Sequence, residues 1–174
     1  SEMCIRDSRK IARDLAEALD HLHARDRIHA DIKPLNVVRV GTTWQLVDLD
    51  VSCAIGEPFG TKKPSLGYCP PEMAQTILDA MDASDRLDTA QLGAYTADKA
   101  YDLWSLGVIA YMLFSGTPPF WGRSDKEILK RVRSTEVKFP PELFRSTSSE
   151  GLSLVRGLLQ RDVELRLTAD QALE

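Results

Sequence analysis

Residues 101–116, with the sequence YDLWSLGVIAYMLFSG, constrain the fold more than any other stretch of the chain. A helix drawn through them carries apolar side chains on almost every side, so it has no polar face to turn towards water. Other elements must therefore cover it all round. We predict a mainly helical protein in which the helix at 101–116 is buried.

A further helix is predicted over residues 9–25, with Ser8 as its N-cap. The apolar residues at helical spacing in it are Ile11, Leu15, Ala18, Leu19 and Leu22. Residues 1–8 show no such spacing, and we expect a non-native or disordered terminus there. His21 and His23 fall near the helix end, where we expect surface residues favoured by the helix C-terminus rather than metal ligands.

The remaining elements are predicted from turn, strand and capping signals. Short apolar strands at 37–40 and 44–47 flank a turn at 41–43 and predict a β-hairpin. Ser124 and Glu127 have the spacing of a capping box that opens a helix, and a further amphipathic helix covers 149–160. Thr168 and Gln171 repeat the capping-box spacing near the end of the sequence.

Composition narrows the classes of function. The 174 residues fit one domain, and a net charge of −4 does not favour a nucleic-acid partner held by bulk electrostatics. The cysteines Cys4, Cys53 and Cys69 have no metal-ligand spacing. The sequence contains no apolar run long enough to cross a bilayer and no signal-peptide pattern. By elimination, we expect a cytoplasmic protein without a membrane segment.

Residues 28–50 carry the polar side chains that indicate chemistry. Asp31, Lys33 and Asn36 lie close together in the sequence, and Asp48 follows after the predicted hairpin. They supply a general base, a cation and two oxygen ligands for a hard metal ion. Phosphoryl transfer needs such a set, because its transition state places charge on oxygens that must be positioned and neutralised.

The same residues resemble the catalytic motifs of eukaryotic protein kinases. The stretch from His29 to Asn36, HADIKPLN, is similar to H-R-D-x-K-x-x-N, and 48–50, DLD, is similar to D-F-G. Later segments follow in the family's order. Residues 68–72 resemble Y-x-A-P-E, 102–107 resemble D-x-W-S-x-G, 116–120 resemble G-x-x-P-F, and Arg166 matches a late arginine of the family.

The resemblance implies a mainly α, protein-kinase-like C-terminal lobe with a small β-hairpin sheet beside the catalytic loop. It covers residues 9–174, and we expect this lobe to be incomplete at both ends, without the family's N-terminal lobe. It also implies ATP and Mg²⁺ as cofactors, and a protein substrate and the missing N-terminal lobe as partners. We expect the chain alone to lack kinase activity and to expose an apolar surface where that lobe would pack.

The resemblance implies a role for each matching residue. Asp31 would be the catalytic base, and Lys33 would neutralise charge on the γ-phosphate. Asn36 and Asp48 would hold Mg²⁺, and Val38 would form the floor under the adenine. Structural or regulatory roles would fall to His29, Leu49, Thr61, Ser65, Glu72, Asp102 and Arg166.

Several of these roles imply specific contacts. Asp102 should accept backbone N–H groups of the catalytic loop, and Arg166 should pair with Glu72. Ser65 should contact Asp31 and Lys33, and its presence, with Lys33 two residues after the base, resembles kinases of the Ser/Thr type. Two alternatives stay open: a pseudokinase that serves as a scaffold, and a small-molecule phosphotransferase, which the motifs after residue 65 disfavour.

The chain departs from the family's pattern at informative positions. Ala30 replaces an arginine that often pairs with an activation-loop phosphate, so we expect activity that does not depend on phosphorylation of Thr61. Asp50 replaces a glycine whose backbone angles L-residues avoid. Either Asp50 adopts the left-handed region and the loop forms, or the loop is restricted and catalysis is weak. An insertion within 78–96 is expected to be a surface loop or short helix.

Overall fold

The computed structural model of the protein describes residues 2–59, 64–83, 92–93 and 95–174. Its helices are α1 (Glu2–His23), α2 (Pro71–Ala83), α3 (Lys99–Ser115), α4 (Asp125–Ser134) and α5 (Ser149–Leu158). Its strands are β1 (Arg27–Ile28), β2 (Val37–Val40), β3 (Thr43–Leu46) and β4 (Cys53–Ala54). Short 3₁₀ helices are η1 (Pro34–Asn36), η3 (Val163–Leu165) and η4 (Gln171–Leu173). The prediction of a mainly helical fold with a small hairpin sheet is confirmed.

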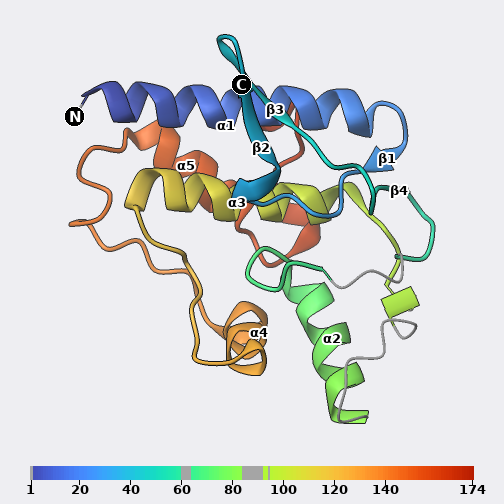
Figure 1. Ribbon diagram of the computed structural model, residues 1–174. Coiled ribbons are helices and arrows are strands. Elements are labelled where there is room, and N and C mark those ends of the chain that lie inside the picture. The colour runs from blue at the N-terminus through green and yellow to red at the C-terminus, as the bar shows by residue number, and fades with distance from the viewer. Residues whose placement is uncertain (1, 60–63, 84–91, 94) are drawn as a thin grey trace.

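Helix α3 runs through the middle of the molecule and is buried from Tyr101 to Tyr111, as its sequence predicts (Figure 1). Asp98 caps its start by accepting the backbone N–H of Ala100 at 2.8 Å. Gly116 ends the helix in the left-handed region, with φ 75°. The helix is therefore defined at both ends by local signals and along its length by burial.

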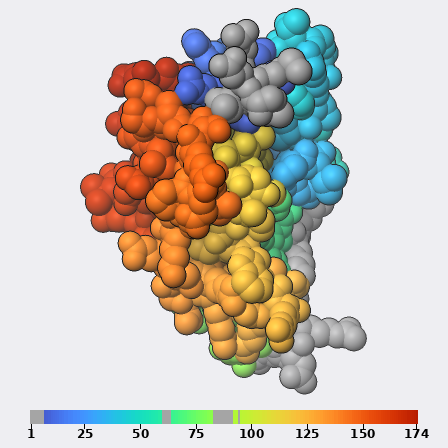
Figure 2. All heavy atoms as spheres, turned by 90° about the vertical axis from the view of Figure 1, so that its left-hand side faces the viewer, coloured from blue at the N-terminus to red at the C-terminus, as the bar shows by residue number. Residues whose placement is uncertain are grey.

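Two apolar cores meet on α3. One joins Leu103 and Leu106 to residues of α1 and α5, and the other joins Trp104 and Val108 to residues of α2 and α4. In the space-filling view, the yellow α3 segment lies between the blue α1 and cyan hairpin on one side and the orange α5 region on the other (Figure 2). Because each side of α3 faces one core or the other, the helix needs no polar face.

Helix α1 begins at Glu2, seven residues before the predicted start at residue 9. Ser8 is therefore not an N-cap. It lies inside the helix, and its hydroxyl donates to the carbonyl of Leu113 on α3 at 3.1 Å. Where we expected a non-native or disordered terminus, the structure has helix from Glu2 onwards, and extending an existing helix costs little even through a polar run. A non-native origin of residues 1–8 stays a prediction.

The hairpin of β2 and β3 crosses α1 and α3 (Figure 1). Val37 pairs with Leu46 and Val40 with Thr43, so two residues form the turn. Gly41 is the first of them and has φ 61°, which suits the mirror-image turns that join twisted strands. Asp14 on α1 binds the hairpin, because its carboxylate accepts the backbone N–H of Trp44 at 2.8 Å.

The segment 78–96, predicted to be a surface loop or short helix, begins as a helix and has buried residues near both ends. Helix α2 continues to Ala83 and buries Leu78, and residues 84–91 lie outside the described residues. Leu92 is fully buried, and the Tyr95 ring packs against Tyr101 with centroids 5.9 Å apart. Apolar side chains on both ends of the insertion thus place those ends in the core, although the region is polar on average.

Capping residues set the starts of the last helices. Ser124 accepts the Glu127 backbone N–H at 3.2 Å, while the Glu127 side chain accepts from Arg123 rather than from Ser124 itself. Gln171 accepts the Thr168 N–H at 3.0 Å, and η4 follows.

In the described part of the chain, none of the helices combines the length and apolar character needed to cross a membrane.

Gly107 allows α3 and α5 to approach closely. A Cβ atom at this position would lie 2.9 Å from Leu158 Cβ and 2.9 Å from Leu159 Cδ2. Alanine favours a helix over glycine by about 1 kcal/mol, but overpacking of a core costs about 1–3 kcal/mol. We expect Gly107→Ala to lower the free energy of unfolding in urea by up to about 2 kcal/mol. A variant more stable than the parent would show that the two helices are not in this close contact.

Asp14 should make stability depend on pH. Burial raises the pKa of its carboxyl, but bonds from Lys10 and Trp44 and the charges of Lys10 and Arg13 outweigh burial and lower the pKa overall. The folded state therefore favours the carboxylate. Its stabilisation is present above the unfolded pKa of about 3.9 and is lost as the pH falls through the folded value.

We expect Asp14→Asn to lower the free energy of unfolding by about 1–2 kcal/mol at pH 7, with the difference from the parent narrowing below about pH 4. Urea unfolding at several pH values measures this. Glu17→Gln is the matched control, because Glu17 pairs with Arg13 at 3.1 Å on the exposed side of the same helix. That control should change stability by at most about 0.5 kcal/mol. An Asp14→Asn deficit that is the same at pH 7 and pH 3 would contradict the assignment.

Candidate active site

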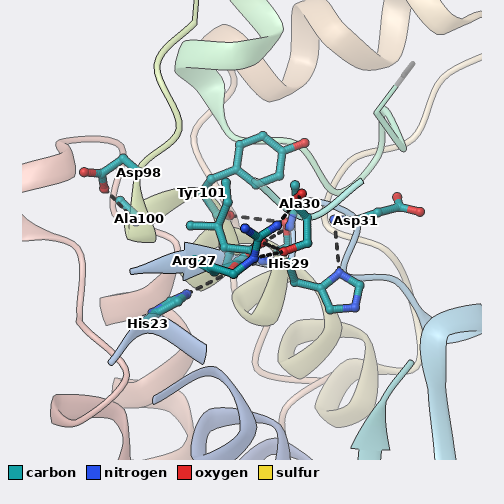
Figure 3. A network of polar contacts seen from close by, with 12 residues as sticks. His23, Arg27, His29, Ala30, Asp31, Asp98, Ala100 and Tyr101 are labelled. Carbon is teal, nitrogen blue, oxygen red and sulfur yellow. Dashed lines mark hydrogen bonds and ion pairs between the residues drawn. The ribbon is translucent and has the colours of Figure 1, made fainter. Parts of the chain in front are cut away.

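Asp102, in the first turn of α3, holds the segment that precedes Asp31. Its carboxylate is 0% exposed and accepts three hydrogen bonds. The Ala30 N–H donates to Oδ1 at 2.9 Å, the His29 N–H donates to Oδ2 at 2.8 Å, and His23 Nε2 lies 2.9 Å from Oδ2. Figure 3 shows this network, with His23 on one side and Asp31 on the other. The expected contact between Asp102 and the catalytic loop is therefore present.

His29 joins the two halves of the site. The ring is fully buried, and its Nδ1 accepts the Asp31 backbone N–H at 3.3 Å. Its Nε2 must then carry the proton, and it donates to the carbonyl of Val47 at 3.0 Å. Since Val47 directly precedes Asp48, one imidazole ties the loop of Asp31 to the loop of Asp48.

The carboxylate of Asp31 lies at the centre of a polar cluster. Ser65 Oγ donates to Oδ1 at 2.6 Å, and Lys33 Nζ lies 2.5 Å from Oδ2. Asn36 Nδ2 donates to the Asp31 carbonyl at 2.8 Å and to Oδ2 at 3.2 Å. Lys33 Nζ also donates to Ser65 Oγ at 3.3 Å, so the contacts expected of Ser65 are both present.

Asn36 and Asp48 fit a hard cation such as Mg²⁺. The short η1 helix buries Asn36, and its carbonyl accepts the Val47 N–H at 2.9 Å, which brings the residue next to the Asp48 segment. Asn36 uses its nitrogen on Asp31, so its carboxamide oxygen is the end available to a cation. Asp48 is exposed and adds a carboxylate. Two protein oxygens suit Mg²⁺, which keeps water and phosphate oxygens as its other ligands.

The unusual backbone angle falls on Asp48 rather than on Asp50. Asp48 has φ 66°, whereas Asp50 is not among the described non-glycine residues with positive φ. The sequence-based concern that Asp50 needs a glycine's conformation is therefore wrong. Asp48 tolerates the left-handed region better than most residues. Leu49, which stands where the D-F-G motif has a phenylalanine, is 55% exposed.

A second set of contacts fixes the segment that ends at Glu72. Arg166 forms a two-point ion pair with Glu72, with Nη1 to Oε1 at 2.9 Å and Nη2 to Oε2 at 3.2 Å. Arg166 also donates to the carbonyl of Ala100 at 2.8 Å, and Ser105 Oγ donates to the carbonyl of Tyr68 at 2.7 Å. The expected pair is present, and it attaches this segment to α3.

The two cysteines whose side chains are described are poor nucleophiles. Burial, followed by the charge of Glu72, raises the pKa of the Cys69 thiol. Burial and the charge of Asp102 likewise raise the pKa of Cys53. Raised pKa values keep both thiols protonated, and protonated thiols react slowly. The chemistry of the site therefore rests on oxygen and nitrogen groups.

Sequence reasoning placed one site residue wrongly. His23 is not a surface residue, because it is 4% exposed and contacts Asp102. A signal was available, since His23 lies four residues after buried Leu19 and thus on the apolar face of α1. Val38 is half-buried in β2 opposite Gln45, and its role beneath an adenine stays a prediction. Thr61 lies outside the described residues.

Comparisons with known proteins agree with this geometry. A model of the protein kinase domain matches residues 2–174. The human phosphorylase b kinase gamma catalytic chain, liver/testis isoform, is 33% identical over 172 residues, which cover 97% of this chain and 39% of that protein. Smooth muscle myosin light chain kinase of Gallus gallus is 30% identical over 176 residues, covering 99% of this chain and 8% of that protein.

A solved structure has the same fold. The twitchin kinase region from C. elegans superposes with a TM-score of 0.77 at 26% identity, covering 97% of this chain and 27% of that one. The chain thus spans less than half the length of each of these relatives. With a family model matched from residue 2 to residue 174 and a kinase fold around Asp31, the chain belongs to the protein kinase family.

Proposed function

We propose that the protein containing this chain is a Ser/Thr protein kinase that transfers the γ-phosphate of ATP to a hydroxyl of a protein substrate. The observation that carries the proposal is the arrangement around Asp31, where Lys33, Asn36 and Ser65 all contact one carboxylate. A carboxylate that Lys33, Asn36 and Ser65 hold in one orientation is pre-organised to accept a proton.

Asp31 would orient the substrate hydroxyl and accept its proton. A carboxylate accepts about four hydrogen bonds, and Ser65, Lys33 and Asn36 use three of these positions. Oδ1 accepts from Ser65 alone among the described residues, which leaves a lone pair there for a substrate hydroxyl. Lys33 is partly exposed and would neutralise charge on the transferred phosphoryl group.

ATP and Mg²⁺ are the proposed cofactors. Asn36 and Asp48 would hold the metal, whose chemistry is to neutralise charge on the phosphate oxygens. Val38 would contact the adenine from β2. The residues of this chain would bind and orient the phosphates, while Asp31 receives the proton of the acceptor hydroxyl.

We further propose that the chain is the C-terminal lobe of a kinase and that an N-terminal lobe completes the ATP site. Two exposed apolar side chains next to the proposed metal ligands support this, since Leu35, before Asn36, is 85% exposed and Leu49, after Asp48, is 55% exposed. Exposed apolar residues gathered in one region usually mark a surface that another part of a protein covers. The 174-residue chain alone is therefore expected to be inactive and to aggregate readily.

Replacing the proposed base tests the activity. In the full-length protein, Asp31→Asn keeps the size of the side chain but removes the proton acceptor. We expect kcat to fall about 10²–10⁴-fold while the KM for ATP changes little. Phosphate transfer from labelled ATP to a protein substrate measures this. Glu164→Gln, an exposed carboxylate in η3, is the control and should leave kcat unchanged.

The outcomes separate a Ser/Thr protein kinase from the two alternatives, a pseudokinase scaffold and a small-molecule phosphotransferase. A full-length protein that binds ATP without transferring phosphate, with Asp31 intact, would favour the pseudokinase scaffold. Transfer to a small molecule but to no protein would favour a phosphotransferase of another class. An Asp31→Asn variant as active as its parent would contradict the role of Asp31.

Replacing Thr61 tests whether activity is independent of phosphorylation there, as an alanine at position 30 leads us to expect. The Ala30 methyl group is buried and carries no charge, so a phosphate on Thr61 would lack an arginine partner at this position. We expect Thr61→Ala in the full-length protein to keep kcat within about twofold, because the main group that would couple phosphorylation to the loop is absent. Kinetic assays of the parent after phosphatase treatment provide a second measurement. Loss of activity in both experiments, with protein level maintained, would contradict the prediction.

A further inference from the structure

The stretch 56–59, which follows β4, pairs with the stretch 95–97, where the insertion ends and the chain leads into α3. Backbone hydrogen bonds join the two stretches, and Pro58 faces Thr96 in an antiparallel bridge. The bonds run from the Gly56 N–H to the Ala97 carbonyl at 2.9 Å, from the Ala97 N–H to the Glu57 carbonyl at 2.8 Å, and from the Phe59 N–H to the Tyr95 carbonyl at 2.7 Å. We call this pairing the 56–59 ladder.

Aromatic rings reinforce the ladder. Phe59 is 5% exposed, and its ring lies 5.8 Å from that of Tyr95 and 5.1 Å from that of Tyr101 on α3, measured between centroids. Tyr95 meets Phe59 edge to face, which is a favourable geometry for two aromatic rings. Burial, followed by the charge of Glu72, raises the pKa of Tyr95, so its ring packs as an uncharged group.

The end of the insertion is itself anchored in the core. Leu92 is fully buried and belongs to the same apolar core as Ile77 of α2. The Tyr95 N–H donates to the Leu92 carbonyl at 2.9 Å, which ties the ladder to this anchor. Since Leu92 and Tyr95 lie in the insertion, the support for 56–59 comes from a part of the chain that departs from the family's spacing.

The ladder lies between β4 and Ser65, whose hydroxyl donates to Asp31 Oδ1 at 2.6 Å. Leu66, the residue after Ser65, is buried in the same apolar core as Phe59, so packing connects the ladder with the Ser65 contact. A phosphate on this segment would find no arginine at position 30, so that charge pair cannot order it. Backbone pairing and aromatic packing supply order without a phosphate.

We propose that Tyr95 is a positioning residue that acts on Ser65 through Phe59 and the 56–59 ladder. The end of the insertion thereby keeps Ser65 against Asp31 and takes the place of a phosphate on the segment. In the described residues, Tyr95 has no contact with the Asp31 side chain, so its effect is indirect. The kinetic part of this inference rests on the proposed kinase function, whereas its structural part is tested without any activity.

Amide hydrogen exchange in the full-length protein tests the ladder. Peptides covering 53–59 and 95–98 should exchange slowly in the parent, because their ladder amides donate hydrogen bonds. Tyr95→Ala should speed exchange in both peptides about 10-fold or more, whereas Tyr95→Phe keeps the ring and should match the parent. Rapid exchange of both peptides in the parent would overturn the proposal, and this measurement does not require that Tyr95→Ala folds.

Kinetics of the full-length protein test the effect on the site. We expect Tyr95→Ala to lower kcat about 10-fold or more, because a looser Ser65 lets the reacting groups move out of place. The KM for ATP should stay within about twofold, since Asn36 is held next to the Asp48 segment through Val47, away from the ladder. Tyr95→Phe should behave like the parent.

A matched control separates positioning from general loss of stability. Phe144 is a buried aromatic residue in the same apolar core, but it packs against Tyr111 at 5.1 Å between centroids. Phe144→Leu should lower the melting temperature and leave both kcat below that temperature and exchange at 56–59 unchanged. If Tyr95→Ala behaves in the same way, its role is purely structural and the proposal is overturned.

Failure of the proposed function can be told apart from failure of this inference. If the parent protein transfers no phosphate at all, the proposed function fails. Hydrogen exchange in the parent, Tyr95→Ala and Tyr95→Phe then still decides whether Tyr95 holds the stretch 56–59.

Discussion

The structure depends on one buried carboxylate that accepts three hydrogen bonds from two separate segments of the chain. Asp102 bonds to His23, His29 and Ala30, which precede it by 79, 73 and 72 residues. An ionised group in a core is stable only when such donors satisfy it, because burial removes its hydration. The start of α3, the end of α1 and the loop before Asp31 must therefore assemble together. Since α3 is also covered by both apolar cores, the position of this carboxylate is fixed by the packing of the whole molecule.

Backbone strain is concentrated next to the proposed reacting groups. Ala30 and Asp48 both have left-handed angles, with φ 69° and 66°. Each is held by a neighbour: Ala30 through its own N–H to Asp102, and Asp48 through Val47, whose carbonyl accepts from His29 and whose N–H donates to Asn36. Such conformations persist when surrounding contacts determine them fully. His29 belongs to both sets of contacts, because its backbone N–H donates to Asp102 beside that of Ala30 and its ring donates to Val47, so the two strained residues are linked through one residue.

The sequence predicted those features that depend on local or periodic patterns. The apolar stretch at 101–116 predicted α3 and its burial. The spacing of Asp31, Lys33 and Asn36 matched the kinase motif, and the three side chains are in contact. It did not predict features set by tertiary contact. Ser8 lies within α1 and bonds to α3, His23 is buried by a partner 79 residues away, and the strain falls on Asp48 instead of Asp50. Residues 78–83 are helical because their apolar side chains join the core, which average polarity conceals.

The carboxamide of Asn36 would allow the proposed base and a proposed metal ligand to lie side by side. Its nitrogen donates to Asp31 at 3.2 Å from Oδ2, while its oxygen is the end that would face a cation. An aspartate at this position would offer a stronger metal ligand but no donor, and two carboxylates would then face each other at this distance. Their repulsion would raise the pKa of one of them and favour its protonation. The amide avoids this conflict, because it presents a partial positive charge to Asp31 and would present a partial negative charge to the proposed cation. The ammonium of Lys33, 2.5 Å from the same Oδ2, places a second positively charged group beside Asp31.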